Sequence, residues 1–386
     1  MSARAPRVLF VDHAGVLGGA ELSLLDLVGA FGDRGEVLLL SDGPFRAALE
    51  ARGIQVTVEP LGALRRVKKE THLPSPAVLT DAVRLSREAA AHARRRDLIY
   101  ANSQKAFVVS AGAGLLARRP VVWHLRDILA PPHFSASNVR AAVALANFRA
   151  ARVITNSRAT AAAFTGAGGR ASLVRVVHNG IDPQPFDGVT DEDALAARSH
   201  LGIPHDAFVV SLFGRFHPWK GQQVLLQALS ALPGVHALFV GAPLFGEEAF
   251  ESALHAQAAK LGIGDRAHFL GFRGDVADLM RASDVVAHTS VYPEPFGRVI
   301  VEGMLARRPV IATRAGGVEE IITDGETGIL VPPDDAEALT AAINGVRAEP
   351  GRAAAIAARG SAHARENFSV AAMVRGVDEA LEGIAR

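Results

Sequence analysis

The chain has no cysteine and almost no net charge. Because none of its 386 residues is Cys, a disulfide framework, a thiolate metal site and a cysteine nucleophile are all excluded. The 41 Lys and Arg residues nearly balance the 40 Asp and Glu residues, which leaves a formal net charge of +1. A chain this close to neutral has no overall electrostatic attraction to nucleic acid, so we predict no nucleic-acid partner.

Long hydrophobic runs are also missing. No stretch of about 18 residues is apolar throughout and free of charge, so the sequence predicts no transmembrane helix. The first residues combine a basic start with an apolar run, as a signal peptide does, but Asp12 and His13 interrupt that run after about five residues. We therefore expect a cytoplasmic protein. Peripheral contact with the inner face of the membrane stays open, because of a basic segment described below.

Several catalytic signatures are absent. The sequence contains no G-x-S-x-G elbow, no P-loop and no H-E-x-x-H zinc motif. Asp191 and Asp193 form an Asp-x-Asp pattern, but they lie in a polar, helix-forming segment and are better explained as a solvated helix start. We therefore predict that the protein needs no metal ion and no cofactor.

Short apolar runs alternate with longer amphipathic stretches along the whole chain. RVLFVD, EVLLLSD, DLIYAN and PVVWHLRD are examples, and the series restarts near residue 207 with AFVVSLFG. Strands that alternate with helices predict parallel sheets covered by helices. Since the chain is too long for one ordinary core, we predict two doubly wound, Rossmann-like α/β domains. A polar, helix-prone linker is expected near residues 182–206.

Ligands of such sheets bind at the carboxyl ends of the strands. After the first predicted strand, Gly18 and Gly19 precede a helix, which allows close backbone approach and offers free N–H groups to an anion. The glycine order differs from the G-x-G-x-x-G fingerprint, which argues against a Rossmann dehydrogenase. A Gly-Gly pair in this position is often only a tight turn, so both interpretations stay open.

The first strand of the second half is followed by two cations. Arg215 and Lys220 flank a turn, and Gly221 opens the next helix. Two fixed cations beside a helix N-terminus match the charge and the N–H geometry of a pyrophosphate. Two solvated surface charges are the alternative, but the position after a strand favours the phosphate site.

The stretch YPEPFGRVIVEG places one glutamate on a loop and a second one in a helix. Two prolines exclude a strand or a helix interior around Glu294. After Gly297 the apolar spacing becomes helical, which puts Glu302 inside a helix. Two carboxylates in this arrangement are suited to gripping a ligand that carries hydroxyl groups.

Other polar or loop residues also follow predicted strands. His124 comes directly after a buried run, although a histidine at a strand end is usually a structural hydrogen-bonding group. Asn156 ends another strand, beside Ser157, which suits a helix N-cap. The backbone around Phe272 and Arg273 is placed to read the edge of a base.

Taken in order, these segments resemble a known family. GGAE (18–21), WHLRD (123–127), VVHNGID (176–182), GRFHPWKG (214–221) and EPFGRVIVE (294–302) are similar to the motifs of GT4-type retaining glycosyltransferases with the GT-B fold. The resemblance covers nearly the whole chain and is densest over residues 207–335. It implies two Rossmann-like domains that face a cleft. The implied parts are an acceptor-binding domain (1–182), a nucleotide-sugar-binding domain (183–365) and a helix crossing back to the first domain (366–386).

The resemblance also implies residue roles. Glu294 would bond hydroxyl groups of the donor sugar, assisted by two backbone N–H groups, and Glu302 would bond the ribose. Arg215 and Lys220 would hold the diphosphate in place of a metal ion. The implied donor-binding residues are Gly18, Gly19, Arg215, Lys220, Phe272, Arg273, Glu294, Phe296, Gly297 and Glu302, and the implied catalytic residues are His124, Arg215, Lys220 and Glu294.

In this family, attack is usually described on the same face as the leaving group, with the leaving phosphate accepting the proton of the acceptor. This chain departs from the family pattern by an inserted Pro218-Trp219 in the phosphate loop. The basic segment 64–76 lies in the half that would bind acceptors, and an acidic acceptor, an anionic membrane and a solvated loop all stay open. The implied acceptor-binding residues are Arg65, Arg66, Lys68, Lys69 and Asn156.

The sequence therefore predicts a metal-independent retaining glycosyltransferase. Its donor would be a UDP- or GDP-linked sugar, and its acceptor a saccharide, a lipid-linked saccharide or a small molecule. A non-catalytic nucleotide-sugar-binding subunit with the GT-B fold and a nucleotide-sugar epimerase are the alternatives.

Overall fold

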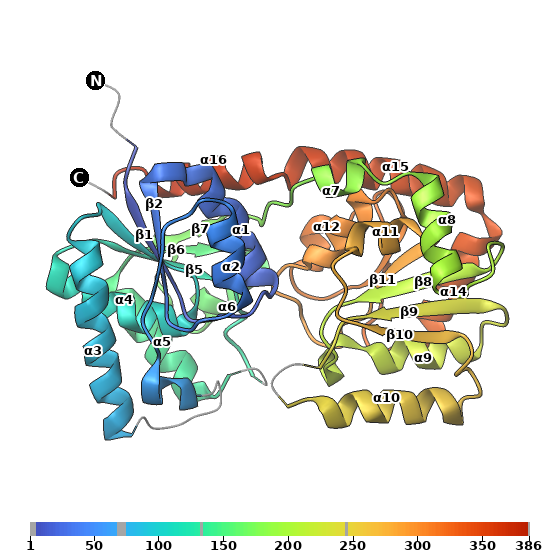
Figure 1. The fold of residues 1–386 in the computed structure, drawn as a ribbon, viewed down its shortest axis with the longest axis horizontal. Helices are drawn as coiled ribbons and strands as arrows, with labels where there is room; N and C mark the ends of the chain where they lie inside the picture. The colour runs from blue at the N-terminus through green and yellow to red at the C-terminus, as the bar shows by residue number, and fades with distance from the viewer. Residues whose placement is uncertain (1–4, 68–74, 132–133, 244–245, 385–386) are drawn as a thin grey trace. The chain divides into compact units, whose positions relative to one another are not determined.

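The computed structural model describes residues 5–67, 75–131, 134–243 and 246–384 (Figure 1). Contacts between residues divide the chain into two units. Unit 1 is formed by Met1–Gly180 together with Val370–Arg386, and unit 2 by Ile181–Ser369. Each unit contains one parallel sheet with helices on its faces, so the predicted pair of Rossmann-like α/β domains is confirmed.

Within the described residues, the sheet of unit 1 has seven strands in the order β3-β2-β1-β4-β5-β6-β7. The central strands are continuous apolar runs because helices bury both of their faces. The strands are β1 (Val8–Asp12), β2 (Gly35–Leu39), β3 (Val56–Val58), β4 (Leu98–Ala101), β5 (Val121–Leu125), β6 (Ala150–Thr155) and β7 (Val174–Val176).

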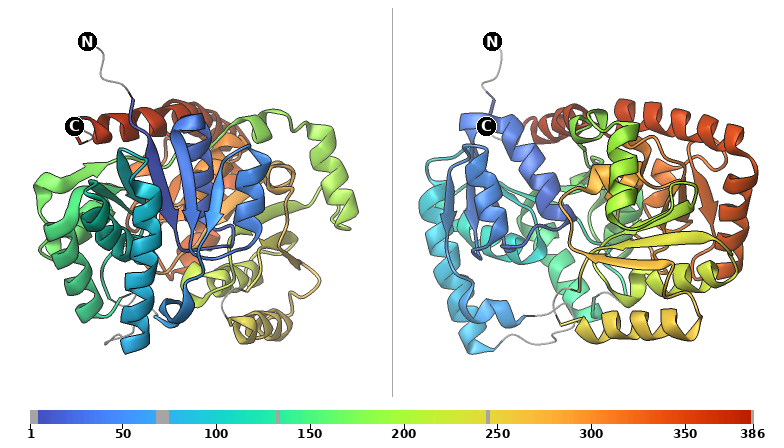
Figure 2. Two further views of the ribbon diagram at one scale, coloured as in Figure 1. Left: turned by 60° about the vertical axis from the view of Figure 1, so that its left-hand side comes forward. Right: turned by 45° about the vertical axis from the view of Figure 1, so that its right-hand side comes forward.

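Two helical layers cover this sheet. One core includes residues of α1, α2 and α16, and the other includes residues of α3, α4, α5 and α6. The helix α16 packs beside α1 (Figures 1 and 2). The helices are α1 (Gly19–Phe31), α2 (Pro44–Ala51), α3 (Pro76–Ala93), α4 (Gln104–Ala117), α5 (Ala136–Arg149), α6 (Arg158–Gly166) and α16 (Val370–Leu381), with 3-10 turns at Gly32–Arg34, Gly62–Arg66 and Ala171–Leu173.

Unit 2 repeats the design with six strands, counted over its described residues, in the order β10-β9-β8-β11-β12-β13. The strands are β8 (Phe208–Phe213), β9 (Val235–Val240), β10 (Ala267–Gly271), β11 (Val285–His288), β12 (Val310–Thr313) and β13 (Ile329–Val331). The helices are α7 (Gln184–Asp187), α8 (Asp191–His200), α9 (Gln222–Ser230), α10 (Glu248–Lys260), α11 (Val276–Arg281), α12 (Arg298–Leu305), α13 (Val318–Ile321), α14 (Ala336–Ala348) and α15 (Pro350–Asn367), with a 3-10 turn at Pro218–Lys220. Over the described ranges, neither unit has a helix long and apolar enough to cross a membrane.

The segment predicted as a linker, 182–206, folds as part of unit 2. Its helix α8 begins with a capping box between Thr190 and Asp193. The buried Arg198 donates to the carbonyl oxygen of Ala282 at 2.7 Å and pairs with Asp284 at 2.9 Å. The sequence did not predict that α8 packs on unit 2 through Arg198, because the polar composition of this helix is typical of a solvated one.

The strand order reverses once in each sheet, and the two strands at this switch point lead to helices on opposite faces of the sheet. In unit 1 it lies between β1 and β4, and in unit 2 between β8 and β11. The loops diverge at the carboxyl ends of these two strands, and sheets of this kind bind ligands there. The fold therefore designates one candidate site in each unit.

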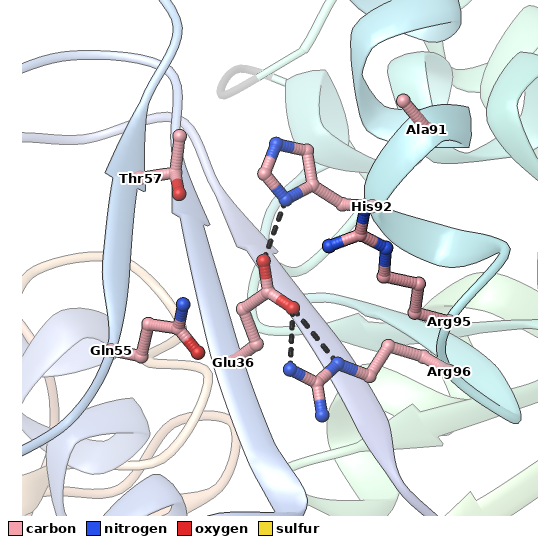
Figure 3. A pocket seen from close by; sticks show the side chains of 7 residues that line it. All are labelled: Glu36, Gln55, Thr57, Ala91, His92, Arg95 and Arg96. Carbon is pink, nitrogen blue, oxygen red and sulfur yellow. Dashed lines mark hydrogen bonds and ion pairs between the residues drawn. The ribbon is translucent and has the colours of Figure 1, made fainter.

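A polar hollow lies at the opposite, amino-terminal end of β2 (Figure 3). At its floor, the buried Glu36 carboxylate is 2.6 Å from Nδ1 of His92 and accepts from Nε of Arg96 at 2.8 Å. The hollow measures 340 Å³ and is lined by Glu36, Gln55, Thr57, Ala91, His92, Arg95 and Arg96. Because two side chains near the end of α3 already bond Glu36, we interpret this cluster as the anchor of α3 on the sheet.

Candidate active site

The loops after β8 and β11 meet at the switch point of unit 2. Lys220 Nζ donates to both carboxylate oxygens of Glu294, at 2.7 and 2.9 Å, although the two residues are 74 apart in sequence. Ser290 Oγ donates to the same carboxylate at 2.9 Å, and Nε2 of His288 lies 3.6 Å from it. The structure thus brings together Lys220 and Glu294, two residues that the sequence suggested for different parts of a donor.

The charge of Glu294 is set by these neighbours. Its side chain is only 19% exposed, and burial by itself would raise its pKa. The ammonium of Lys220, followed by His288, outweighs burial and holds the pKa of Glu294 well below its usual value. Glu294 is therefore an ionised carboxylate, able to accept hydrogen bonds from hydroxyl groups.

Close backbone contacts hold the two loops in place. Gly221 has a φ of +72°, and a Cβ atom there would lie 1.9 Å from the carbonyl oxygen of Thr289. Gly316 has a φ of +70°, with a Cβ position 2.4 Å from the carbonyl oxygen of Glu294, which also accepts from the N–H of Gly317 at 2.8 Å. Glycine is required at 221 and 316 because a side chain would separate the loops.

The side chain of Trp219 contacts the neighbouring cation, Arg215. The guanidinium carbon of Arg215 lies 5.5 Å from the centre of the Trp219 ring, a cation–π arrangement. The backbone N–H of Trp219 donates to Nδ1 of His217 at 3.3 Å, and Nε2 of His217 is 3.3 Å from Glu247. The turn between Arg215 and Lys220 therefore places an aromatic ring against Arg215.

The predicted helix after Gly297 is confirmed as α12. Gly297 has a φ of +106° and caps the helix, which begins at Arg298. Glu302 lies within α12 at 3.4 Å from Nε of Arg298. Phe296 is buried against Phe368, with ring centres 5.7 Å apart, so it anchors the loop that carries Glu294.

Phe272 and Arg273 follow β10, an edge strand of the sheet of unit 2. The Phe272 side chain is 77% exposed, and Arg273 pairs with Asp275 at 2.8 Å through Nε. Across the described part of unit 2, no hydrogen bond or ion pair links these two residues to Lys220 or Glu294. These two residues are therefore not part of the hydrogen-bonded Lys220–Glu294 cluster, and their contact with a base stays a prediction.

In unit 1, His124 is completely buried in β5. Its Nδ1 lies 2.5 Å from the hydroxyl oxygen of Tyr100, whose pKa is raised by burial, so the tyrosine keeps its proton and donates. Burial, and then the charge of Arg126, lower the pKa of His124 well below its usual value. The imidazole is therefore neutral, and its Nε2 has no partner among the residues that the structure describes.

The glycine pair of unit 1 opens α1. Gly19 is the first residue of the helix, and the N–H of Gly18 donates to a carboxylate oxygen of Glu21 at 3.0 Å. Glu21 is buried, and burial together with the negative charge of Asp12 raises its pKa to about 7. This turn is thus capped by the chain's own carboxyl group.

The predicted acceptor residues are not gathered at one point by any described contact. Asn156 is buried and accepts from the Thr160 hydroxyl at 2.9 Å, within the start of α6, where Ser157 is the N-cap as predicted. Arg65 and Arg66 are exposed at the end of a 3-10 turn. Lys68 and Lys69 lie outside the described residues.

A buried polar network at the switch point of unit 1 was missed by the sequence interpretation. Asp12, at the end of β1, accepts from the Asn102 amide at 2.5 Å, and Asn102 accepts from Nε of Arg126 at 2.6 Å. Arg126 also donates to Ser23 at 3.0 Å and to Asn179 at 2.7 Å. The signal was available, since Asp12, Asn102 and Arg126 each end or directly follow a buried strand.

Among the described residues, no group of three or more His, Asp or Glu side chains is arranged to hold a metal ion. Metal independence stays a prediction.

Two family models match the chain. Glycosyltransferase Family 4 matches residues 17–185, and Glycosyl transferases group 1 matches residues 194–363. The curated D-inositol 3-phosphate glycosyltransferases of Mycobacteroides abscessus and Rhodococcus jostii are 39% and 38% identical over 161 and 214 residues. These stretches cover 41% and 51% of this chain but only 35% and 46% of the relatives, so the match spans less than half of their length.

A solved structure matches over the full length. Anabaena HepE, in complex with UDP and glucose, is 43% identical to this chain, with a TM-score of 0.90 and coverage of 98% of this chain and 100% of HepE. The structure of a Rickettsia africae glycosyltransferase, at 21% identity and a TM-score of 0.81, covers 97% of this chain and 98% of its own and supports the fold. The end-to-end match to HepE and the two family models together show that the chain belongs to the group 1, family 4 glycosyltransferases with the GT-B fold.

Proposed function

We propose that this glycosyltransferase moves a sugar from a nucleoside diphosphate sugar to a hydroxyl group of its acceptor, with retention of configuration and without a metal ion. Unit 2 would bind the donor and unit 1 the acceptor. The observation that carries this proposal is the Lys220–Glu294 pair at the switch point of unit 2, with Arg215 on the same loop as Lys220.

Breaking the bond between sugar and phosphate leaves a nucleoside diphosphate anion. Cations that are already in position lower the barrier because they stabilise the charge as it develops. Lys220 and Arg215 would supply these charges, while the N–H groups at the start of α1 and the neutral imidazole of His124 would act as hydrogen-bond donors.

The ion pair also suggests how the donor is gripped. A diphosphate would compete with Glu294 for the ammonium of Lys220. A released Glu294 carboxylate would then accept hydrogen bonds from hydroxyl groups of the sugar, helped by the N–H groups of Phe296 and Gly297. Glu302, on the following helix, would bond the ribose.

The relatives suggest which ligands to test first. HepE was solved with UDP and glucose and with UDP-glucose, which makes UDP-glucose the first donor candidate. The curated relatives are named for D-inositol 3-phosphate, which makes that compound one acceptor to include beside saccharides and lipid-linked saccharides.

A thermal-shift panel with UDP, GDP, ADP and their sugar conjugates tests donor binding, because a ligand of the native state raises the melting temperature. Release of UDP from UDP-glucose should persist in EDTA, and proton NMR of the first product should show the anomeric configuration of the donor. Folded protein that responds to no nucleotide would contradict the donor assignment. Loss of activity in EDTA would contradict the fixed-cation mechanism.

A further inference from the structure

The positive charge of unit 1 is concentrated in its second half. Residues 84–175 contain 15 Lys and Arg residues but three Asp and Glu residues, a formal charge of +12 in a chain whose net charge is +1. Several of these arginines lie at the C-terminal ends of α3, α4 and α5, which precede the neighbouring strands β4, β5 and β6. Because the strands are parallel, these helix ends lie at the amino-terminal edge of the sheet, opposite to the loops of the switch point.

Contacts between side chains and backbone join the three helix ends into one surface. Nη2 of Arg119, just after α4, donates to the carbonyl oxygen of Arg94, just after α3, at 3.1 Å. Nη2 of Arg149, the last residue of α5, would lie 3.8 Å from a Cβ atom at Gly114, in the last turn of α4. We call this surface, formed by residues 94–95, 115–119 and 148–149, the helix-end patch.

Large apolar side chains are exposed among the arginines of the helix-end patch. Phe148 is 82% exposed, Leu115 63% and Leu116 50%. The guanidinium carbon of Arg149 lies 5.9 Å from the centre of the Phe148 ring, so a cation and an aromatic ring meet at one point. The partial negative charge of a helix C-terminus explains arginine at these positions. It does not explain apolar side chains that are gathered in contact with water.

The acidic side chains beside the helix-end patch are already paired with other arginines. Asp97 lies 3.8 Å from Nε of Arg7, and the Glu36 carboxylate lies 2.6 Å from Nη2 of Arg96. Over the ranges that the structure describes, no ion pair joins an arginine of the patch to an Asp or Glu side chain. The positive charge of the patch is therefore not neutralised by the chain itself.

The arginines also have more donors than the chain supplies acceptors. Nε of Arg119 and Nε of Arg149 are buried without a hydrogen-bond partner among the described residues. In β6, burial and then the charge of Arg175 lower the pKa of Arg152, as expected where cations gather without anions. A surface of this kind is suited to a partner that brings negatively charged oxygens.

We propose that the helix-end patch binds an anionic lipid surface, with its arginines on the lipid phosphates and with Phe148 and Leu115 in the headgroup region. A membrane satisfies both parts of the patch, because its negative potential attracts the cations and its interface takes up apolar side chains. A soluble polyanion would leave the apolar side chains in water. A second copy of the chain, joined through the same patch, would bring positive charge against positive charge.

The helix-end patch differs from the basic segment 64–76, for which the sequence left contact with a membrane open. It lies at the opposite end of the strands from the loops that carry the candidate site of unit 1, so lipid binding does not involve those loops. The inference therefore stands independently of the proposed function, and lipid binding can be measured without a donor.

Flotation with lipid vesicles tests the proposal. Vesicles of phosphatidylcholine alone are compared with vesicles that also contain about one third phosphatidylglycerol, which makes the surface anionic. Arg95→Gln combined with Arg118→Gln removes charge from the patch, and Phe148→Ser removes its most exposed apolar side chain. Arg352→Gln and Leu195→Ser, at exposed positions of unit 2, are the matched controls.

We expect the wild type to float with the anionic vesicles and not with the neutral ones, and to be released as salt rises from about 0.1 M to about 0.5 M. Each cation beside an anionic surface contributes about fivefold, so the double arginine variant should bind about 20-fold less. Phe148→Ser should bind about tenfold less. The controls should bind as the wild type does. Melting temperatures equal to that of the wild type show that the variants are folded.

Four results would overturn the proposal. The first is wild-type protein that does not float with anionic vesicles. Flotation that responds to the arginine variant but not to Phe148→Ser would favour a soluble polyanion as the partner. Flotation that survives both variants but is lost in Arg65→Gln combined with Arg66→Gln would assign lipid binding to segment 64–76. A dimer in sedimentation that Phe148→Ser dissociates would assign the patch to a second copy of the chain.

Discussion

Replacing Glu21 by glutamine should change how the stability of unit 1 depends on pH. The Glu21 side chain is buried at the first turn of α1, and burial together with the charge of Asp12 raises its pKa from 4.5 to about 7. Between these two pH values the folded chain holds a proton that the unfolded chain has released. The free energy of unfolding therefore falls as pH rises through this window.

The size of the effect follows from the size of the rise in pKa. Each unit of pKa shift corresponds to about 1.4 kcal/mol, so the rise from 4.5 to about 7 stabilises the protonated folded chain by about 3 kcal/mol. The wild type has lost this stabilisation by pH 8. Glutamine is always neutral and retains an oxygen that can accept from the N–H of Gly18, so Glu21→Gln avoids this loss. Its stability relative to the wild type should rise by about 2 to 3 kcal/mol between pH 5 and pH 8.

Urea unfolding at pH 5, 6, 7 and 8 measures this difference. The chain has two tryptophans, so a Trp219→Phe background leaves the buried Trp123 as the fluorescent reporter of unit 1. Glu88→Gln, at an exposed position of α3, is the matched control for loss of one negative charge. A difference between Glu21→Gln and the wild type that does not change with pH would refute the reasoning.

Three further substitutions test the site of unit 2. Lys220→Ala should weaken UDP binding about tenfold or more, measured by calorimetry, because a charge-assisted contact to the diphosphate is removed; unchanged affinity would remove that role. Glu294→Ala, which releases Lys220, should leave UDP affinity equal or higher while kcat with UDP-glucose falls at least about 100-fold; the opposite ranking would exchange the two roles. Gly221→Ala should destabilise unit 2 by at least about 2 kcal/mol more than Gly202→Ala in urea. Both glycines have positive φ, but a Cβ atom would meet the Thr289 backbone at 221, whereas no described atom lies within 4 Å of a Cβ atom at 202. Equal losses of stability in the two variants would contradict this contact.

Much of the fold could be predicted because its signals are local. Apolar runs bounded by turn residues indicated the strands of both sheets, and the alternation with helices indicated that the strands are parallel. The start of α12 after Gly297 and the N-cap at Ser157 were also predicted correctly. The docking of α8 was not, because burial of Arg198 depends on carbonyl groups far away in the sequence.

The candidate site was predicted residue by residue but not as an arrangement. Lys220, Arg215 and Glu294 were named for their positions after strands, and the structure adds the direct bond between Lys220 and Glu294. His288 was not named, although it lies at the end of a buried strand beside this pair.

Local sequence patterns were enough to infer which segments become strands and helices, where glycine and proline shape the loops, and which polar side chains follow the strands. These preferences act over a few residues, so they can be read without knowing the rest of the chain. Which of those side chains meet depends instead on the order of the strands in each folded sheet. Asp12 contacts Asn102, and Lys220 contacts Glu294, because the strand order makes β1 a neighbour of β4 and β8 a neighbour of β11. The charge states of Asp12, Glu21 and Glu294 also depend on folding. Their pKa values are set by burial and by neighbouring charged groups, and both are present only once the sheets have formed.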